Sequence, residues 1–217
     1  MIDSYELFLS NYVSKEDFFN FGLTETIFID KYKVSEYWEL LKKDIKNNNP
    51  VPIRGFGRDA KGTNLFIDFY SQVFNNKNVF KDSTNNHNPS KLIQELTGLK
   101  KGKDIRNYQI SHIFGRTKNI YTFTAPWNIV FKPKILDPFT GHEAKGDMVN
   151  EYQKEFYQLS YNKFQPYIED YNEIITSPNI QLKIEEYFNE LQISLSEKEL
   201  NKFKIAIKEE LSPIIIS

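Results

Sequence analysis

Apolar residues in roughly the last third of the chain recur at helical spacing, which places them on one face of a helix. The clearest examples are the aromatic residues Tyr152, Phe156, Tyr157 and Phe164. Pro166 and Pro178 interrupt this pattern, because proline lacks a backbone N–H and disfavours a helix interior. Residues 141–217 are therefore predicted to form about three helices, separated near these two prolines.

The first eighty residues show a mixed pattern. An apolar-periodic run that opens at Ser35 predicts an amphipathic helix ending at the polar breaker of residues 47–50. A glycine-rich stretch follows, with the residues Arg54, Gly55, Gly57, Arg58, Lys61 and Gly62. Such a loop could approach a phosphate group closely, although a turn-rich connector explains it equally simply.

The middle of the chain contains two segments that read as extended. Residues 100–112 pass from a basic, glycine-containing turn into a strand-like run that ends at His112. After a polar loop, residues 120–133 read as a second extended run, interrupted by Pro126. We therefore expect a pair of strands here, joined by a loop that follows His112.

Two S/T-x-x-E patterns predict where helices begin, because each can form a capping box. Thr140 and Glu143 form the first, so a helix is expected to begin at residue 141 with His142 in its first turn. Ser196 and Glu199 form the second, ahead of the final apolar-periodic run. The third histidine of the chain, residue 87, falls in a predicted polar turn.

These patterns predict an α+β fold, in which a small strand, strand, helix unit is embedded in a mostly helical domain. Of the 217 residues, 40% are hydrophobic and 15% are aromatic, which favours a folded chain with a sizeable core. We divide it into a mixed α/β region over residues 1–80, a basic core over 81–150 and a helical region over 151–217.

The chain contains no cysteine, which excludes disulfides, thiolate catalysis and cysteine-based zinc sites. The N-terminal residues lack a basic segment followed by an apolar one, and no apolar run approaches the length that spans a bilayer. We therefore expect a cytoplasmic protein that does not interact with a membrane.

The charges are unevenly distributed, although the net charge is only -1. Residues 81–134 carry ten Lys and Arg against three acids, whereas residues 150–217 carry seven Lys against twelve acids. A basic middle favours a polyanionic partner such as DNA, and the acidic C-terminal region does not. The competing explanation is that these charges only solvate two faces of the molecule.

His112, Asn128 and His142 occur at intervals of 16 and 14 residues, in the predicted order strand, strand, helix. The segments around them read ISHI, PWNIV and GHEAKG. Here, over about forty residues, the sequence resembles the HNH nucleases of the ββα-metal class. The resemblance implies a metal-dependent endonuclease that hydrolyses phosphodiester bonds in DNA.

The resemblance also implies a role for each residue. His112 is the general base, Asn128 fixes the loop after His112 through its amide, and His142 binds a divalent cation. That cation is Mg²⁺ or a transition metal such as Mn²⁺ or Zn²⁺. Many family members carry a second metal ligand just before the base, where this chain has Ser111. Asp137 is our candidate for that second ligand.

Basic residues near the proposed base are candidates for binding phosphate oxygens. Arg116 and Lys118 lie in the loop after the base, and Lys145 follows the predicted metal ligand. Surface solubility is the competing explanation for Lys118. Asp147 and Asn150 are weaker candidates for the second metal ligand.

By analogy, the chain length and the sequence outside the motif suit a restriction or phage-defence nuclease, acting as a homodimer or with a partner subunit. Two alternatives stay open: a non-catalytic nucleic-acid-binding module, and an interaction subunit of a defence complex. In either case His112 and His142 would be structural histidines.

Overall fold

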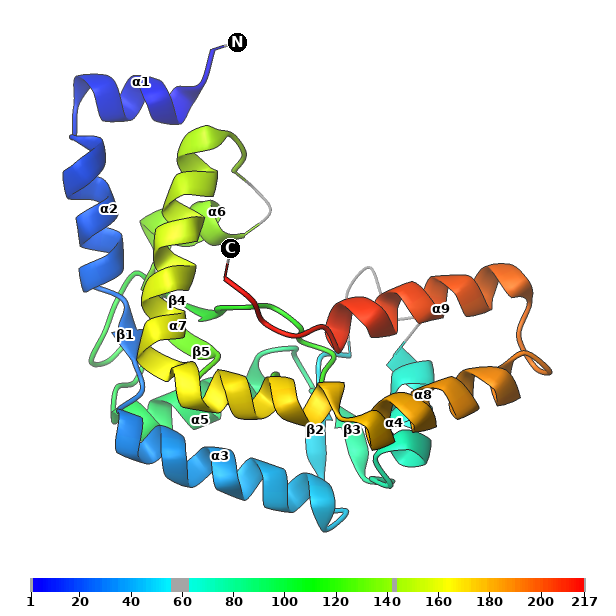
Figure 1. Ribbon diagram of the computed structural model, residues 1–217. Coiled ribbons are helices and arrows are strands. Elements are labelled where there is room, and N and C mark those ends of the chain that lie inside the picture. Colours follow the sequence, from blue (N-terminus) through cyan, green and yellow to red (C-terminus); the bar gives the residue numbers. More distant parts are fainter. Residues whose placement is uncertain (1, 56–62, 142–143, 217) are drawn as a thin grey trace.

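The computed structural model describes residues 2–55, 63–141 and 144–216 (Figure 1). The strands are β1 (Ile27–Phe28), β2 (Val51–Ile53), β3 (Val79–Lys81), β4 (Tyr108–His112) and β5 (Ile129–Pro133). The α-helices are α1 (Ser4–Asn11), α2 (Lys15–Thr24), α3 (Lys31–Lys46), α4 (Thr63–Val73), α5 (His87–Thr97), α6 (Asp137–Thr140), α7 (Asp147–Thr176), α8 (Pro178–Leu191) and α9 (Glu197–Glu210). The 3₁₀ turn η2 (Lys134–Leu136) precedes α6. The fold is therefore α+β and mostly helical, as predicted.

The main sheet has the order β1-β5-β4, and both pairs of strands are antiparallel. All five residues of the central strand β5 are buried, because elements pack on both of its faces. A second sheet joins β2 and β3 in parallel. The predicted extended run over residues 120–133 forms a strand only in β5, and the rest of it belongs to the loop that follows β4.

Helix α7 covers one face of the main sheet and bends in the middle (Figure 1). Phe28 lies opposite Val130 in the β1–β5 pair, and its ring contacts the rings of Phe156 and Phe164 on α7. Phe164 has non-helical angles of φ −121° and ψ 16°, two residues before Pro166. The predicted interruption near Pro166 is confirmed as a bend, because a proline ring conflicts with the preceding turn.

The predicted helix start at Thr140 is wrong. Thr140 is the last residue of α6, and α7 begins only at Asp147. Pro138 lies in the first turn of α6, where its fixed φ and missing N–H favour a helix start earlier in the sequence. His142 lies outside the described residues, so its predicted place in a helix is not described either.

The other capping prediction is confirmed. The side chain of Ser196 accepts a hydrogen bond from the backbone of Glu199, and the side chain of Glu199 reaches back to the backbone of Ser196. Two further expectations are corrected: α3 begins at Lys31 with Asp30 as its cap, and His87 is the first residue of α5. Asp30 is a strong N-cap residue, and its place ahead of the apolar run explains the earlier start.

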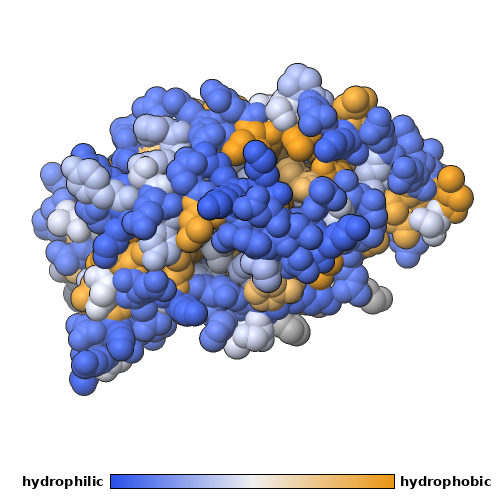
Figure 2. All heavy atoms as spheres, turned by 90° about the horizontal axis from the view of Figure 1, so that it is seen from below, coloured by the Kyte–Doolittle hydropathy of each residue, from blue (hydrophilic) through white to orange (hydrophobic). Residues whose placement is uncertain are grey.

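One buried core unites the three regions that we distinguished in the sequence. Strand β1, from the first region, pairs with β5, and the C-terminal Ile214 packs in the same core as Trp38 and Phe131. On the face seen in Figure 2, apolar residues appear in small groups among hydrophilic ones. None of the helices in the described part of the chain combines the length and apolarity that a bilayer crossing requires.

A lysine lies fully buried at the centre of this arrangement. Lys132, on β5, hydrogen-bonds the hydroxyl of Thr140, and its ammonium lies 4.3 Å from the centre of the Phe156 ring. Burial lowers the pKa of Lys132 to about 7, although the negative charge of Asp137 opposes this shift. The charged form of Lys132 is therefore destabilised in the folded protein relative to the unfolded chain in water.

We predict that Lys132→Met removes a pH-dependent contribution to stability. In the wild type, Lys132 should contribute a rise of about 2–3 kcal/mol in the free energy of unfolding between pH 7 and 10, because the unfolded chain binds the Lys132 proton more tightly over this range. Urea denaturation at several pH values measures this rise, and Lys134→Met is the exposed control. Equal pH dependence in Lys132→Met and the wild type would contradict the prediction.

Candidate functional site

The chain segments that follow β2, β3 and β4 meet at one place. The backbone N–H of Arg54 donates to the carbonyl of Thr117 at 2.9 Å, which joins the segment after β2 to the loop after β4. The N–H of Asp82 donates to the carbonyl of Ile53 at 2.8 Å, which joins the segment after β3 to the last residue of β2. The carboxyl ends of parallel strands are common places for functional groups.

Gly55 allows the segments after β2 and β3 to approach closely. Its N–H donates to the Oδ1 of Asn85 at 3.0 Å. A Cβ atom at Gly55 would lie 2.4 Å from the Cβ of Lys81, which is closer than such atoms can pack. Any side chain at this position would push the two segments apart.

His112 occupies this meeting point with its ring in a defined orientation. Its Nε2 lies 2.9 Å from the carbonyl oxygen of Phe123, and the two rings stack with an interplanar angle of 12°. A carbonyl can only accept a hydrogen bond, so Nε2 carries the proton in the neutral ring and Nδ1 keeps a lone pair. The arrangement therefore leaves Nδ1 as a proton acceptor.

The surroundings of His112 keep it neutral. Burial, assisted by the positive charge of Arg54, lowers the pKa of His112 to about 4, and the negative charge of Asp82 acts in the opposite direction. A hydrogen bond from the ring to the carbonyl of Phe123 also favours the charged form, but it is outweighed. At neutral pH His112 is an unprotonated imidazole.

Asn128 ties together both ends of the loop that follows His112. Its buried side-chain Oδ1 accepts a hydrogen bond from the N–H of Phe114 at 2.9 Å. Its Nδ2 donates to the carbonyls of Gly115 at 3.2 Å and Thr122 at 3.0 Å. The amide thus uses both its acceptor and its donors to fix the loop that presents the Phe123 carbonyl to His112.

Arg116 binds the C-terminal segment of the chain. Its guanidinium donates to the carbonyls of Ser212, Pro213 and Phe114, at distances between 2.9 and 3.1 Å, and to the hydroxyl of Ser212. These bonds hold Arg116 in the left-handed region, with φ at 52°. The guanidinium that we predicted to bind phosphate is therefore engaged within the protein.

Lys118 contacts the same end of the chain. Its backbone N–H donates to the Oε2 of Glu210 at 2.9 Å, and its ammonium lies 5.3 Å from the centre of the Phe66 ring. Burial raises the pKa of Glu210 to about 7, although the bond from Lys118 and the nearby positive charges oppose this shift. The loop after His112 and the end of α9 are thus held together at several points.

Asp137 and His112 are directed to opposite sides of the main sheet. His112 lies opposite Ile129 in the β4–β5 pair, and Lys132, three residues beyond Ile129, points to the other face. That is the face of Phe156 and α7, where the charge of Asp137 acts on Lys132. Strand alternation therefore separates the proposed base from our candidate for the second metal ligand.

Within residues 2–55, 63–141 and 144–216, no group of three or more His, Asp or Glu side chains could hold a metal ion. His142, the ligand implied by the resemblance, lies outside these residues. Lys145 is exposed just before α7. The residues that the structure describes do not by themselves form a metal centre.

The structure adds two charged residues near His112. Arg54 is exposed, and within the described parts of the chain no hydrogen bond or salt bridge engages its guanidinium. Asp82 is buried, and hydrogen bonds from Asn88, His87 and Thr84 lower its pKa against the opposing effect of burial. Asp82 therefore caps the start of α5, whereas the guanidinium of Arg54 is available to bind a ligand.

Of these two residues, the sequence indicated only Arg54 as a candidate for binding a ligand. Arg54 belongs to the glycine-rich stretch that we considered for phosphate binding, of which residues 56–62 lie outside the described part. No sequence pattern indicated that Asp82 lies near His112, because its position depends on the pairing of β2 with β3.

Comparison with known proteins relates most of the chain to one family. Residues 29–216 match the family model described as "Uncharacterised protein PM1201". The protein of that name from Pasteurella multocida (strain Pm70) is 44% identical over 189 residues, which cover 85% of this chain and 86% of that protein. The chain belongs to the PM1201 family. No solved structure is significantly similar to this PM1201 family member.

We predict that Asn128→Asp destabilises the protein by about 2–4 kcal/mol, because a carboxylate would face the carbonyls of Gly115 and Thr122 in place of the amide donors. Urea denaturation gives the free energy of unfolding, and hydrogen exchange should show faster exchange at the N–H of Phe114. Asn189→Asp, at an exposed position of α8, is the matched control. Equal stability of the two variants would disprove the role of the Asn128 amide.

Proposed function

We propose that this PM1201 family member is a nuclease that hydrolyses phosphodiester bonds in DNA, with His112 as the general base. The main support is the ring geometry of His112: its Nε2 is held by the Phe123 carbonyl, which leaves Nδ1 free to accept a proton from water. The resemblance to HNH nucleases provides the substrate class. A role in restriction or phage defence is part of the same proposal and rests on that resemblance.

The protonation state of His112 supports this role. With a pKa near 4, the imidazole is ready to accept a proton throughout the neutral range. Such a base is weaker than one with a pKa near 7, so accurate orientation must supply more of the rate enhancement. The bonds that Asn128 makes to the loop after His112 provide that orientation.

Arg54 is the residue that we assign to the phosphate group. Its guanidinium is exposed, and its charge acts on His112, so that a phosphate bound to Arg54 would lie close to the base. Guanidinium groups bind phosphate oxygens through paired hydrogen bonds. The bond from the Arg54 backbone to Thr117 fixes where its side chain begins.

A divalent cation remains part of the proposal, with His142 as its ligand. The described residues do not form a set of ligands around His112. We therefore assign no step of the reaction to the cation, and the residues described here bind phosphate and accept the proton.

Incubation with supercoiled plasmid and Mg²⁺ or Mn²⁺ should yield nicked DNA, and His112→Ala should lower the rate by about 100-fold or more, as expected on loss of a general base. His87→Ala, at an exposed histidine on α5, is the matched control, and EDTA should abolish cleavage. The acid limb of the wild-type rate should have its midpoint near pH 4, since that is where His112 becomes protonated.

Equal nicking by the wild type and His112→Ala would exclude His112 as the base. If neither protein cuts but both bind DNA with strong salt dependence, the protein is a binding module. A midpoint of the acid limb near 6.5, the pKa of an unperturbed histidine, would instead contradict the proposed environment of the base.

We expect Arg54→Ala to reduce single-turnover cleavage by about 10- to 100-fold, because it removes a charge-assisted contact with phosphate. Arg54→Lys should recover only part of this loss, since an ammonium lacks the paired donors. Arg106→Ala, which removes an exposed arginine from the basic segment of residues 81–134, is the matched control. Equal losses in Arg54→Ala and Arg106→Ala would show only a general effect of charge.

A further inference from the structure

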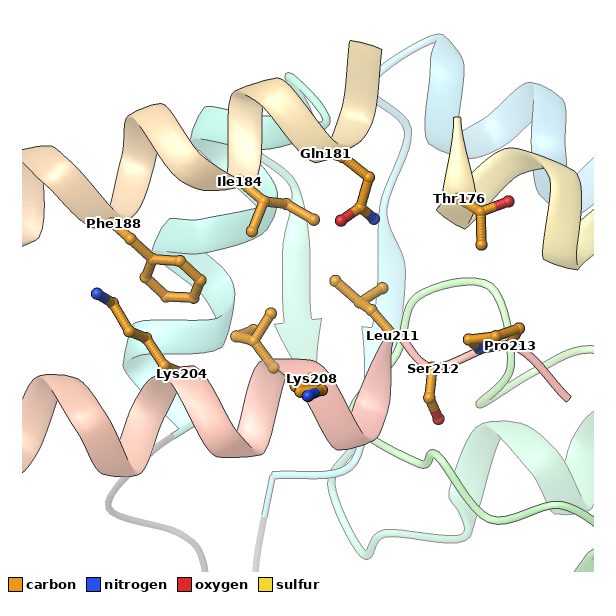
Figure 3. A pocket seen from close by; sticks show the side chains of 10 residues that line it. Thr176, Gln181, Ile184, Phe188, Lys204, Lys208, Leu211, Ser212 and Pro213 are labelled. Atoms are coloured by element: carbon orange, nitrogen blue, oxygen red, sulfur yellow. The ribbon is translucent and has the colours of Figure 1, made fainter. Parts of the chain in front are cut away.

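A groove of about 310 Å³ lies between α8, α9 and the C-terminal segment (Figure 3). In Figure 1 these two helices form a hairpin that extends away from the main sheet. The groove is lined by Thr176, Gln181, Ile184, Phe188, Lys204, Ile207, Lys208, Leu211, Ser212 and Pro213. Its size is at the lower end of the range of small-molecule sites, which is roughly 300–1,000 Å³.

The floor of the groove is apolar. Ile184 and Phe188 come from α8, Ile207 comes from α9, and Leu211 directly follows α9. Most of this floor is aliphatic, and Phe188 is its only aromatic ring among the described residues. Such a surface favours a hydrocarbon chain over a polar ligand.

Two lysines supply the charge of the groove. Lys204 and Lys208 are four residues apart on α9, so they lie on the same side of the helix. The ammonium of Lys204 lies 5.5 Å from the centre of the Phe188 ring, and Figure 3 shows these two side chains next to each other. Among the described residues that line the groove there is no Asp or Glu, and no salt bridge engages either lysine.

We propose that this groove binds a soluble aliphatic carboxylate of medium chain length. The hydrocarbon chain would lie on Ile184, Ile207 and Leu211, and the carboxylate would bind Lys204 and Lys208. The pairing of an apolar floor with two unneutralised cations favours a ligand that has both an apolar body and a single anionic end. This proposal does not depend on the nuclease activity.

The groove shares two residues with the contacts that hold the loop after His112. Ser212 and Pro213 line the groove and also accept the hydrogen bonds of Arg116, in the loop that follows His112. A ligand that contacts this segment would restrict its movement. Hydrogen exchange in residues 113–119 should therefore slow when the groove is occupied.

Isothermal titration with sodium octanoate tests the proposal, with acetate and 1-octanol as probes of the charge and of the hydrocarbon chain alone. Octanoate should bind saturably, and Lys204→Glu/Lys208→Glu should weaken it at least tenfold. Lys198→Glu/Lys202→Glu is the matched control, because it changes two exposed lysines with the same spacing on the same helix, outside the groove. Circular dichroism checks that both variants are folded.

Three results would overturn the proposal. Absence of saturable octanoate binding to the wild type would exclude the site. An equal loss of affinity in both double variants would show only non-specific attraction to α9. Acetate or 1-octanol binding as tightly as octanoate would show that the charge or the hydrocarbon chain is not recognised.

Discussion

The side-chain amide of Asn128 fixes the loop between β4 and β5, and the arrangement around His112 depends on that loop. Three hydrogen bonds from one buried group join Phe114, Gly115 and Thr122 across the loop. A buried amide must satisfy its donors and its acceptor, so this conformation is strongly preferred over others. The carbonyl of Phe123 is then held where it fixes the orientation of the His112 ring.

The loop is also held from outside by parts of the chain that are distant in sequence. The segment after β2 contacts it at Thr117, and the segment after α9 binds the side chain of Arg116. Because these contacts come from both halves of the molecule, the site around His112 depends on the whole fold. The groove between α8 and α9 shares Ser212 and Pro213 with this network, which connects a second surface to the same loop.

Much of the fold could be predicted from local sequence signals. The strand ending at His112, the interruptions near Pro166 and Pro178 and the capping box at Ser196 all appear in the structure, because each depends on neighbouring residues. The error at Thr140 arose from two competing local signals. The pattern that begins with Thr140 resembled a capping box, but Pro138 had already begun a short helix.

Local sequence patterns were enough to predict the α+β class, the strand that ends at His112 and the helices of the C-terminal region. They also singled out His112 and Asn128 as candidates, since periodicity and short motifs depend on neighbouring residues. The charged groups around His112 follow from contacts between distant parts of the chain. The fold places Arg54 where its charge acts on His112, engages Arg116 with the C-terminal segment and directs Lys132 to the other face of the sheet. These placements depend on strand register and on contacts between distant segments, which no local pattern encodes.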